Sequence, residues 1–342
     1  MARSREPGEP ERGGRLAVVV PVRDGGADLS RCLAALGRAL EGLDAEVVVV
    51  DDGSSDDSAE RARMAGARVL RSGGSGLGPA EARNVGVRAV EAPVVLFVDA
   101  DVVVHREAPR RLLAALEEEG FAAAYGSYDC APPARNLASL YMNLRHHHGH
   151  RQPTDDAGTF WSGLGAVRRD VFLAVEGFDA RRFPRPSVED VDLGRRLRAA
   201  GGRIRRDPAA LATHLKRWSL ASVVHTDIVC RAWPWAGMMV EHPGELRELN
   251  AAPSEQLRAL LALGLLLACA ASLLGLLPWA VAAGALLAAL AANRSLLEVL
   301  ARGAGWSRGL LLVVLHQVHL VYAGVTFVLR RLLGARLSAS AS

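Results

Sequence analysis

The sequence is poor in lysine, in aromatic residues and in cysteine, and each shortage disfavours a class of protein. Lys216 is the only lysine among 41 basic residues, aromatics make up 5% of the 342 residues, and no basic run alternates with aromatic side chains. This pattern disfavours a nucleic-acid partner, which needs a basic surface with stacking side chains. The four cysteines show no C-x-x-C spacing, which disfavours a zinc site or disulfide framework and favours a reducing compartment.

Two phosphate-binding motifs are also missing. No G-x-G-x-x-G follows the first apolar segment and no G-x-x-x-x-G-K-[ST] occurs anywhere, which disfavours a dinucleotide dehydrogenase and a P-loop enzyme. Residues 1–15 are rich in Arg, Glu, Gly and Pro and lack the apolar core of a signal peptide. We therefore expect a disordered N-terminal tail that stays in the cytosol.

The sequence does contain an apolar segment that runs into two carboxylates. Residues 94–98 read Val-Val-Leu-Phe-Val, which predicts a strand buried on both faces, and Asp99 and Asp101 follow it one residue apart. Because side chains alternate along a strand, both carboxylates are expected on one side, where they could hold Mg²⁺ or Mn²⁺ against a diphosphate. A polar strand end that caps the next helix is the alternative.

The region before this segment alternates between strand and helix patterns. Strands are expected at 16–22, 46–50 and 68–70, and helices at 29–40, 59–65 and 79–90. Such alternation predicts a parallel sheet with helices on both faces. Acidic groups close the first, second and fourth strands. Carboxylates that face a phosphate need a metal between them, and a carboxylate can accept the N3–H of uracil, so a nucleoside diphosphate and a divalent cation are indicated.

Seven short motifs follow one another along residues 16–240. They are Val-Val-Pro-Val-Arg-Asp at 19–24, Val-Val-Asp-Asp-Gly-Ser-Ser-Asp-Asp at 49–57, Ala-Arg-Asn-Val-Gly at 82–86, Phe-Val-Asp-Ala-Asp at 97–101, Gly-Leu-Gly-Ala-Val-Arg-Arg at 163–169, Gly-Phe-Asp at 177–179 and Glu-Asp-Val-Asp-Leu-Gly-Arg-Arg-Leu at 189–197. In this order and spacing the chain resembles a membrane-anchored bacterial family 2 glycosyltransferase. The resemblance implies an α/β fold of the GT-A type, a Rossmann-like mixed sheet with helices on both faces.

The resemblance also implies roles for the matching residues. Pro21, Asp24, Asp51 and Asp52 would line the base and ribose, Arg83 the nucleotide pocket, and Asp99 and Asp101 the metal site. Asp190 would be the general base that deprotonates the acceptor hydroxyl, and a base opposite the leaving diphosphate gives inversion at the sugar carbon. The alternative for Glu189 and Asp190 is a structural one, carboxylates that interact with a helix dipole.

The resemblance also suggests roles for two glycines, a tryptophan and a histidine farther along the chain. Gly163 and Gly165 would leave room for the donor sugar, and Trp161 would stack on a sugar ring or fill the core. His214 would complete the metal shell beside Asp101 or be structural.

The basic segment that follows His214 is also open to two interpretations. Lys216, Arg217 and Trp218 would lie at the diphosphate or acceptor, where a cation would neutralise the departing diphosphate, or they would form a membrane-facing basic cluster. Glu189 is a further candidate for the acceptor or diphosphate site.

The run Arg-His-His-His-Gly-His-Arg at 145–151 is expected to be a solvated loop after a helix at 132–144. A cationic loop over the acceptor or a membrane phosphate is the favoured function, and metal binding the less favoured one. Processive members of the family carry Gln-x-x-Arg-Trp, whereas this chain has Arg-Ala-Trp-Pro-Trp at 231–235. We therefore expect a single sugar addition.

The C-terminal third predicts membrane attachment. Residues 259–292 contain no ionisable side chain except Cys269, and Pro278 lies near their middle. We expect a hairpin of two spans at 257–277 and 279–292 and a third span at 309–329, about three in all. The expected divisions are a tail at 1–15, a catalytic domain at 16–218, an interfacial helix region at 219–256, a transmembrane region at 257–333 and a tail at 334–342.

The sequence as a whole predicts a multi-pass inner-membrane enzyme with a cytoplasmic catalytic domain. It would transfer one sugar, with inversion, from a nucleoside diphosphate sugar, preferably a UDP-sugar, to a lipid-linked or cell-envelope acceptor, using Mn²⁺ or Mg²⁺. The alternatives are a nucleotidyltransferase-like enzyme, which also uses paired carboxylates, and a catalytically silent membrane scaffold of the same fold. The sugar, the acceptor and the oligomeric state are left open.

Overall fold

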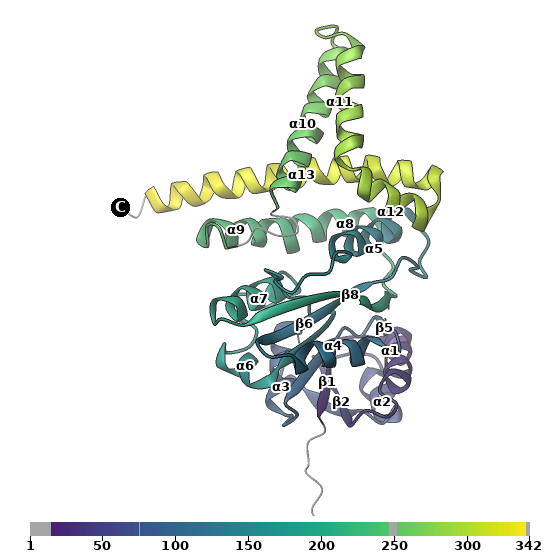
Figure 1. Cartoon of the computed structure of the whole chain (residues 1–342), viewed down its shortest axis with the longest axis vertical. Helices are drawn as coiled ribbons and strands as arrows, with labels where there is room; N and C mark the ends of the chain where they lie inside the picture. The colour runs from purple at the N-terminus through teal and green to yellow at the C-terminus, as the bar shows by residue number, and fades with distance from the viewer. Residues whose placement is uncertain (1–14, 75, 246–251, 340–342) are drawn as a thin grey trace, which may run out of the picture.

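The computed structural model describes residues 15–74, 76–245 and 252–339 (Figure 1). The predicted N-terminal tail therefore lies, except for Arg15, outside the described residues. One eight-stranded mixed sheet runs in the order β3-β2-β1-β4-β7-β6-β8-β5. The strands are β1 Leu16–Val22, β2 Ala45–Asp51, β3 Arg68–Arg71, β4 Val94–Val98, β5 Val102–Val104, β6 Phe121–Tyr128, β7 Leu164–Arg168 and β8 Arg203–His214.

The first four strands are parallel, as the alternating pattern predicted. β1 pairs in parallel with both β2 and β4, and β2 pairs in parallel with β3. β7 is antiparallel to β4 and to β6, which makes the sheet mixed. The observed α/β architecture agrees with the predicted GT-A fold.

Helices cover both faces of the sheet because each strand divides its side chains between two cores. In β1, Leu16, Val18 and Val20 belong to one core, while Ala17 and Val19 belong to the other. The first core is shared with α1 Gly26–Ala39, α2 Ser58–Met64 and α4 Ala108–Glu117, and the second with α3 Pro79–Arg88, α6 Arg169–Ala174 and α7 Glu189–Ala199.

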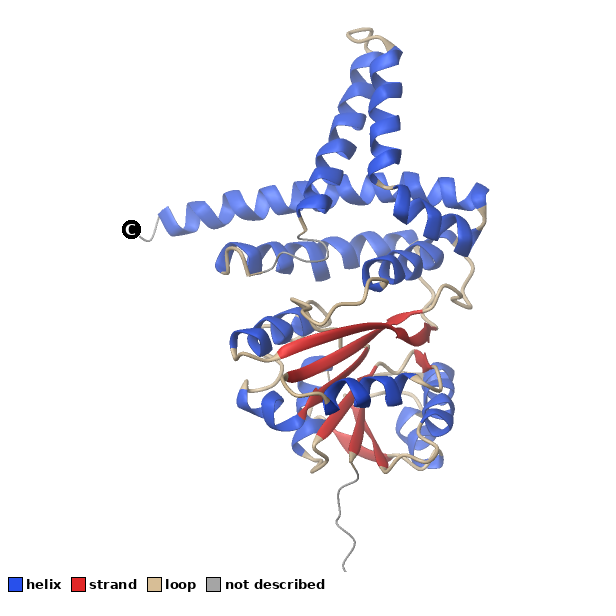
Figure 2. Ribbon diagram, in the orientation of Figure 1, coloured by secondary structure: helices blue, strands red, loops and turns tan. Residues whose placement is uncertain are grey.

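A second group of helices lies over the end of the sheet that carries β6 and β8 (Figures 1 and 2). We call this group the helical layer. It consists of α5 Leu137–His150, α8 Leu220–His225, the π-helix η1 Thr226–Ala232, α9 Trp233–Glu241, α12 Arg294–Ala304 and α13 Trp306–Ala339. Apolar side chains of α5, α12 and α13 form a third core around Trp218.

The remaining helices, α10 Pro253–Leu273 and α11 Trp279–Ala292, form the predicted hairpin, which projects away from the rest of the molecule (Figure 1). Among the described residues, two helices are long and apolar enough to span a membrane, Pro253–Leu273 and Trp306–Leu333. α11 reaches that length only together with α12, across a bend of 75°. The count is therefore two, or three if the bent pair is one span.

Two predicted boundaries differ from the structure. The third predicted span lies within α13, which continues to Ala339, so residues 334–339 are helical rather than part of a tail. The predicted helix at 132–144 begins instead at Leu137, because the Asn136 side chain caps it by accepting a hydrogen bond from the Ser139 N–H, and it continues to His150.

Candidate active site

The carboxyl ends of β1, β2 and β4 meet at one edge of the sheet, and the loops that follow them carry the predicted nucleotide-binding residues. Pro21 lies within β1. Asp24 follows with a φ of 53°, and its carboxylate accepts hydrogen bonds from the N–H (2.7 Å) and hydroxyl (2.9 Å) of Ser55. Asp51 accepts from the N–H of Ser54 at 2.8 Å. Asp24 therefore holds the β2–α2 loop against the segment that follows β1, and Asp51 closes a turn at the start of that loop.

Asp52 is buried and shapes the glycine-rich loop before α3. Its carboxylate accepts hydrogen bonds from the Ser72 hydroxyl (2.6 Å) and from the N–H groups of Leu77 (3.0 Å) and Gly78 (2.8 Å). Gly78 has a φ of 91°, a conformation that favours glycine. The sequence does not reveal this structural role of Asp52; its contact with a base or ribose stays a prediction.

Arg83 joins two parts of the site that are far apart in the sequence. Its guanidinium donates to Asp99 at 2.6 Å and to Glu189 at 3.2 Å, and only 3% of the residue is exposed. Burial alone would lower the pKa of Arg83, but the two carboxylates outweigh it and raise the pKa. A buried arginine between two carboxylates stays charged and fixes both of them.

The two metal candidates Asp99 and Asp101 both lie at the site, but the strand argument used for them is wrong in detail. β4 ends at Val98, and Asp99 and Asp101 belong to the turn before β5, in which the Val102 N–H donates to the Asp99 carbonyl at 3.1 Å. A turn and not strand alternation therefore places the two carboxylates, with Asp99 bonded to Arg83 and Asp101 beside His214.

His214 lies beside Asp101, as predicted. Its Nε2 is 3.4 Å from the Asp101 carboxylate, because β8 pairs with β5 so that His214 lies opposite Val102. The ring also stacks on Tyr128, with centroids 4.5 Å apart. Among residues 15–74, 76–245 and 252–339, no three His, Cys, Asp or Glu side chains are already arranged as a metal site.

Asp190 opens α7, as predicted, and faces the segment before β7. One carboxylate oxygen accepts from the Val191 N–H at 2.9 Å and the other from the Ser162 N–H at 3.3 Å. Burial, followed by the repulsion of Glu189, raises the pKa of Asp190 to about 7. A pKa near 7 gives Asp190 the basicity that a general base would need near neutral pH.

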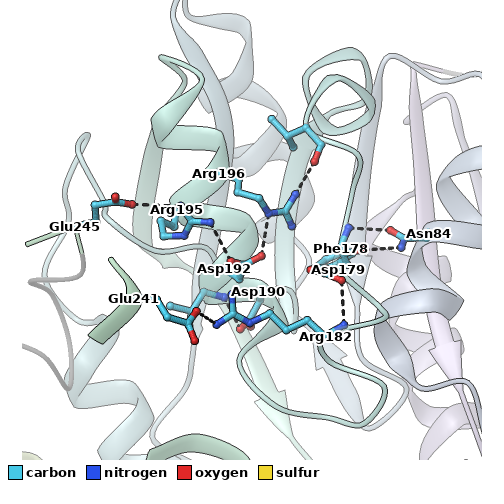
Figure 3. A network of polar contacts seen from close by, with 12 residues as sticks. Asn84, Phe178, Asp179, Arg182, Asp190, Asp192, Arg195, Arg196, Glu241 and Glu245 are labelled. Carbon is cyan, nitrogen blue, oxygen red and sulfur yellow. Dashed lines mark hydrogen bonds and ion pairs between the residues drawn. The ribbon is translucent and has the colours of Figure 1, made fainter. Parts of the chain in front are cut away.

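The other two carboxylates of α7, Asp192 and Glu189, form ion pairs with arginines. Asp192 is turned toward Arg195 (3.3 Å) and Arg196 (2.8 Å), as Figure 3 shows. Glu189 accepts from Arg83 and from the Ser187 N–H. Asp190 is thus the carboxylate of this helix that carries no ion pair within the described residues.

Asn84 links α3 to the segment that precedes α7. Its amide donates to the carbonyl of Phe178 at 2.8 Å and accepts from the N–H of Phe178 at 2.9 Å (Figure 3). This reciprocal pair holds the Gly-Phe-Asp motif at 177–179 next to Arg83, whose guanidinium lies over the Phe178 ring.

Gly163 and Gly165 make room for aromatic rings of this chain. A Cβ atom on Gly163 would lie 2.5 Å from the Trp161 ring, and one on Gly165 would lie 2.5 Å from the Phe160 ring. Contact of these glycines with a donor sugar stays a prediction. Trp161 packs edge-on against Tyr128 and near the His146 ring, beside the loop that holds Asp190.

The family model for glycosyl transferase family 2 matches residues 17–175, which contain the predicted nucleotide-binding and metal residues. Residues 17–175 form a family 2 glycosyltransferase domain. Asp190, in α7, lies after the last matched residue.

Two curated relatives carry related names. Pre-mycofactocin glycosyltransferase of Mycobacterium tuberculosis is 32% identical over 220 residues, covering 60% of this chain and 43% of that protein. Validoxylamine A glucosyltransferase of Streptomyces hygroscopicus is 31% identical over 222 residues, covering 54% of this chain and 52% of that protein. The chain thus spans about half the length of the curated relatives it matches.

A solved structure extends the likeness to the helical layer. The mannosyltransferase PcManGT of Pyrobaculum calidifontis, in complex with GDP-Man and Mn²⁺, has a TM-score of 0.54 at 17% identity, over 95% of this chain and 88% of that one. This likeness concerns the fold alone.

The histidine run of the glycosyltransferase is not the solvated cationic loop that we predicted. It forms the last turns of α5, where His146 and His150 pack against Trp161 and His148 bonds Ser295 of α12 at 2.9 Å. Burial lowers the pKa of His148 to about 4 and of His150 to about 3. These side chains are therefore neutral at pH 7, because the helical layer covers them.

The segment after His214 is also buried in part. Trp218 is buried in the third core, and its backbone N–H donates to the Ser139 hydroxyl at 2.8 Å. Its role at the diphosphate stays a prediction. Lys216 lies over the Trp218 ring, and Arg217 is exposed.

Tyr128 and Ser162 are site residues that the sequence analysis missed. Tyr128 ends β6 and touches the rings of His214, Trp161 and His146, while Ser162 lends its N–H to Asp190. Tyr128 ends an apolar run in the sequence, which is a weak signal. A backbone donor such as that of Ser162 has no signal in the sequence.

Proposed function

We propose that this chain is an inverting glycosyltransferase that transfers one sugar from a nucleoside diphosphate sugar to a hydroxyl group of a membrane-associated acceptor. The observation that carries the proposal is the placement of Asp190, with its raised pKa, next to the Arg83–Asp99 pair at the carboxyl end of β4. This brings a base for the acceptor and charged groups for the donor to one edge of the sheet.

The donor diphosphate would lie over the loops that follow β1, β2 and β4. Asp24 and Asp51 shape the loop that would meet the base and ribose, and Asp52 orders the neighbouring glycine-rich loop by accepting from the N–H of Gly78. A UDP-sugar is our first choice, because a carboxylate at the base can accept the N3–H of uracil.

Asp101 and His214 are the groups that would hold a divalent cation, with Asp99 as a third candidate. Two neighbouring ligands of one cation at 2.0–2.1 Å lie about 3 Å apart, close to the 3.4 Å between Asp101 and His214. Carboxylate oxygen and imidazole nitrogen both suit Mn²⁺. When bound, the cation would balance the negative charge of the diphosphate. Asp99 already pairs with Arg83, so its role as a ligand would require that pair to loosen.

In the proposed transfer, the oxygen of the acceptor attacks the anomeric carbon while the bond from that carbon to the diphosphate oxygen breaks. The acceptor proton passes to the carboxylate of Asp190, and the diphosphate leaves with the electron pair of the broken bond. Attack from the face opposite the diphosphate inverts the anomeric configuration. Arg83 keeps Glu189 and Asp99 in place on either side of the reacting groups.

We propose that the hairpin of α10 and α11 attaches the enzyme to the inner membrane, with the catalytic domain in the cytoplasm where nucleotide sugars are made. The hairpin exposes large apolar side chains, among them Leu266 (52%), Leu273 (74%) and Leu276 (71%). Exposed apolar surface of this extent fits lipid better than water. Single addition follows from the absent Gln-x-x-Arg-Trp motif.

The proposal is tested by titrating the detergent-solubilised full chain with UDP- and GDP-sugars, with and without Mn²⁺, in a calorimeter. GDP-sugars are included because the solved mannosyltransferase was in complex with GDP-Man. We expect Mn²⁺-dependent binding of one donor that Asp101→Asn weakens about tenfold or more. Asp156→Asn, an exposed aspartate, is the matched control. Equal binding by Asp101→Asn and wild type would remove Asp101 from the site, and failure of every donor would contradict the function.

A further inference from the structure

A basic pocket lies between the catalytic domain and the helical layer, on the far side of α7 from the sheet. It has a volume of about 290 Å³. The loop at 182–187 forms one wall, α9 forms another, and Arg330 of α13 closes it. None of these residues has a role in the proposed transfer.

The pocket has more positive than negative charge. Three of its side chains are arginines, Arg182, Arg185 and Arg330, and one is an acid, Glu241, which pairs with Arg182. Within the described part of the chain no carboxylate pairs with Arg185 or with Arg330, whose guanidinium lies over the Trp233 ring, 5.6 Å from its centre. Two arginines are thus available to an anion.

α13 places this pocket at the edge of an apolar surface. On its inner side α13 runs along η1 and α9, because Tyr322 bonds Asp227 and, two turns later, Arg330 reaches Trp233. Its outer side exposes apolar side chains at helical spacing, namely Leu310, Leu311, Val314, Val318, Val325, Val328, Leu329 and Leu332. A membrane that meets this stripe has its headgroups at the level of the pocket beneath it.

We propose that the pocket binds the phosphate of an anionic membrane-lipid headgroup. The proposal rests on the membrane attachment given under the proposed function. The guanidinium group of arginine can donate two parallel hydrogen bonds to two oxygens of one phosphate. Tryptophan favours the headgroup region of a bilayer. The anionic inner leaflet supplies such headgroups at high concentration.

The loop that lines the pocket also leads into the active site. Ser187 lines the pocket, and its N–H donates to the Glu189 carboxylate at 2.8 Å, one residue before Asp190. A headgroup held by Arg185 would therefore steady the start of α7. The lipid site and the catalytic base are linked through this short segment of chain.

The experiment is native mass spectrometry of the full chain in a non-ionic detergent, titrated with phosphatidylglycerol or phosphatidylcholine. We expect one phosphatidylglycerol to be retained in preference to phosphatidylcholine. Arg185→Gln combined with Arg330→Gln should weaken this binding about a hundredfold, about tenfold for each lost hydrogen bond to a charged group. Arg331→Gln is the matched control, since it removes the same charge from the next residue of α13, which is exposed.

Three outcomes would overturn the proposal. These are equal retention of the two lipids by the wild type, equal phosphatidylglycerol binding by the double variant and the wild type, or an equal loss in Arg331→Gln. Displacement of the lipid by inorganic phosphate at comparable concentration would also overturn it, because it would make free phosphate the ligand. Arg185→Gln alone, in an exposed loop, serves if the double variant does not fold.

Donor binding is measured on the same samples. A double variant that loses the lipid but keeps Mn²⁺-dependent donor binding supports the pocket and leaves the transferase proposal intact. Normal lipid binding without any donor binding would contradict the transferase and not the pocket.

Discussion

Two regions of this protein solve the same problem, how to keep polar side chains in place, in opposite ways. In the nucleotide half, residues 16–104, aspartates accept hydrogen bonds from loops that follow neighbouring strands, as Asp52 does from Gly78. In the helical layer, polar side chains pair with one another across long stretches of chain. Arg145 of α5 bonds Asp227 of η1 at 2.6 Å and contacts His319 of α13 at 3.0 Å.

The difference reflects what each region packs against. The loops of the nucleotide half follow parallel strands that end at one edge of the sheet, so their carboxylates can be held by N–H and hydroxyl groups of adjacent loops. Asp227 is buried and Arg145 is partly buried between helices of the helical layer, and a charge buried there needs an opposite charge at short range. Burial would raise the pKa of Asp227, but Arg145 and His319 outweigh it and lower the pKa.

Asp190 lies where the two regions meet, and changing it should have the largest effect. Asp190→Asn keeps the size of the side chain but cannot accept the acceptor proton. We expect a loss in kcat of about 10²–10⁴-fold, with donor affinity nearly unchanged because the donor contacts belong to the nucleotide half. Steady-state kinetics with calorimetric donor binding measures both.

The control for this variant is Asp28→Asn, an exposed aspartate of α1. If donor affinity falls together with turnover, Asp190 belongs to the donor site. If turnover survives, the base lies elsewhere.

Breaking the Arg145–Asp227 pair tests the helical layer by itself. Arg145→Met leaves a buried carboxylate whose nearest remaining arginine, Arg231, is 3.6 Å away. We expect a loss of about 3–5 kcal/mol in the free energy of unfolding, seen as a lower melting temperature in detergent. Replacing both partners, Arg145→Met with Asp227→Leu, should recover much of it.

The matched control is Arg294→Met, which removes a surface ion pair in the same layer and should cost less than about 1 kcal/mol. A loss as small as that in Arg145→Met would show that the buried pair adds nothing beyond a surface pair.

The pH dependence of turnover sharpens the same comparison. Because the raised pKa of Asp190 is about 7, the carboxylate is protonated below that pH and cannot act as a base. We expect kcat/KM to fall about tenfold per pH unit below pH 7 and to level off above it. A rate profile with its midpoint near pH 4 would mean that Asp190 is not buried in the active enzyme.

The histidines of α5 should make the helical layer sensitive to acid, with a smaller effect. The unfolded chain has histidine pKa values near 6.5, whereas burial lowers the pKa of His148 to about 4. Between these values the unfolded chain binds the extra proton, so stability falls as the pH falls. The contribution is about 1.4 kcal/mol per pH unit for each such proton.

Melting temperatures between pH 7.5 and 5 measure this slope. His148→Gln can still bond Ser295 and should flatten the slope, while His225→Gln, at an exposed position, should not. Identical slopes in wild type and His148→Gln would show that His148 is not buried in solution.

Much of the nucleotide half follows from the sequence. Apolar runs such as that at 94–98 specify strands because nothing but a sheet interior buries both faces of a short segment. The aspartates after these strands come together because parallel strands end at one edge. The order and spacing of the seven motifs also predicted the family whose model matches residues 17–175.

Other features depend on contacts that only the folded chain makes. The predicted solvated histidine loop is the end of a helix whose His148 bonds Ser295 of α12, and the Trp161 ring occupies the space above Gly163. Burial beside Glu189 raises the pKa of Asp190 to about 7. The physical reason is that the strand pattern and turn chemistry act between residues close in the chain, whereas burial and ion pairing depend on which distant segments meet.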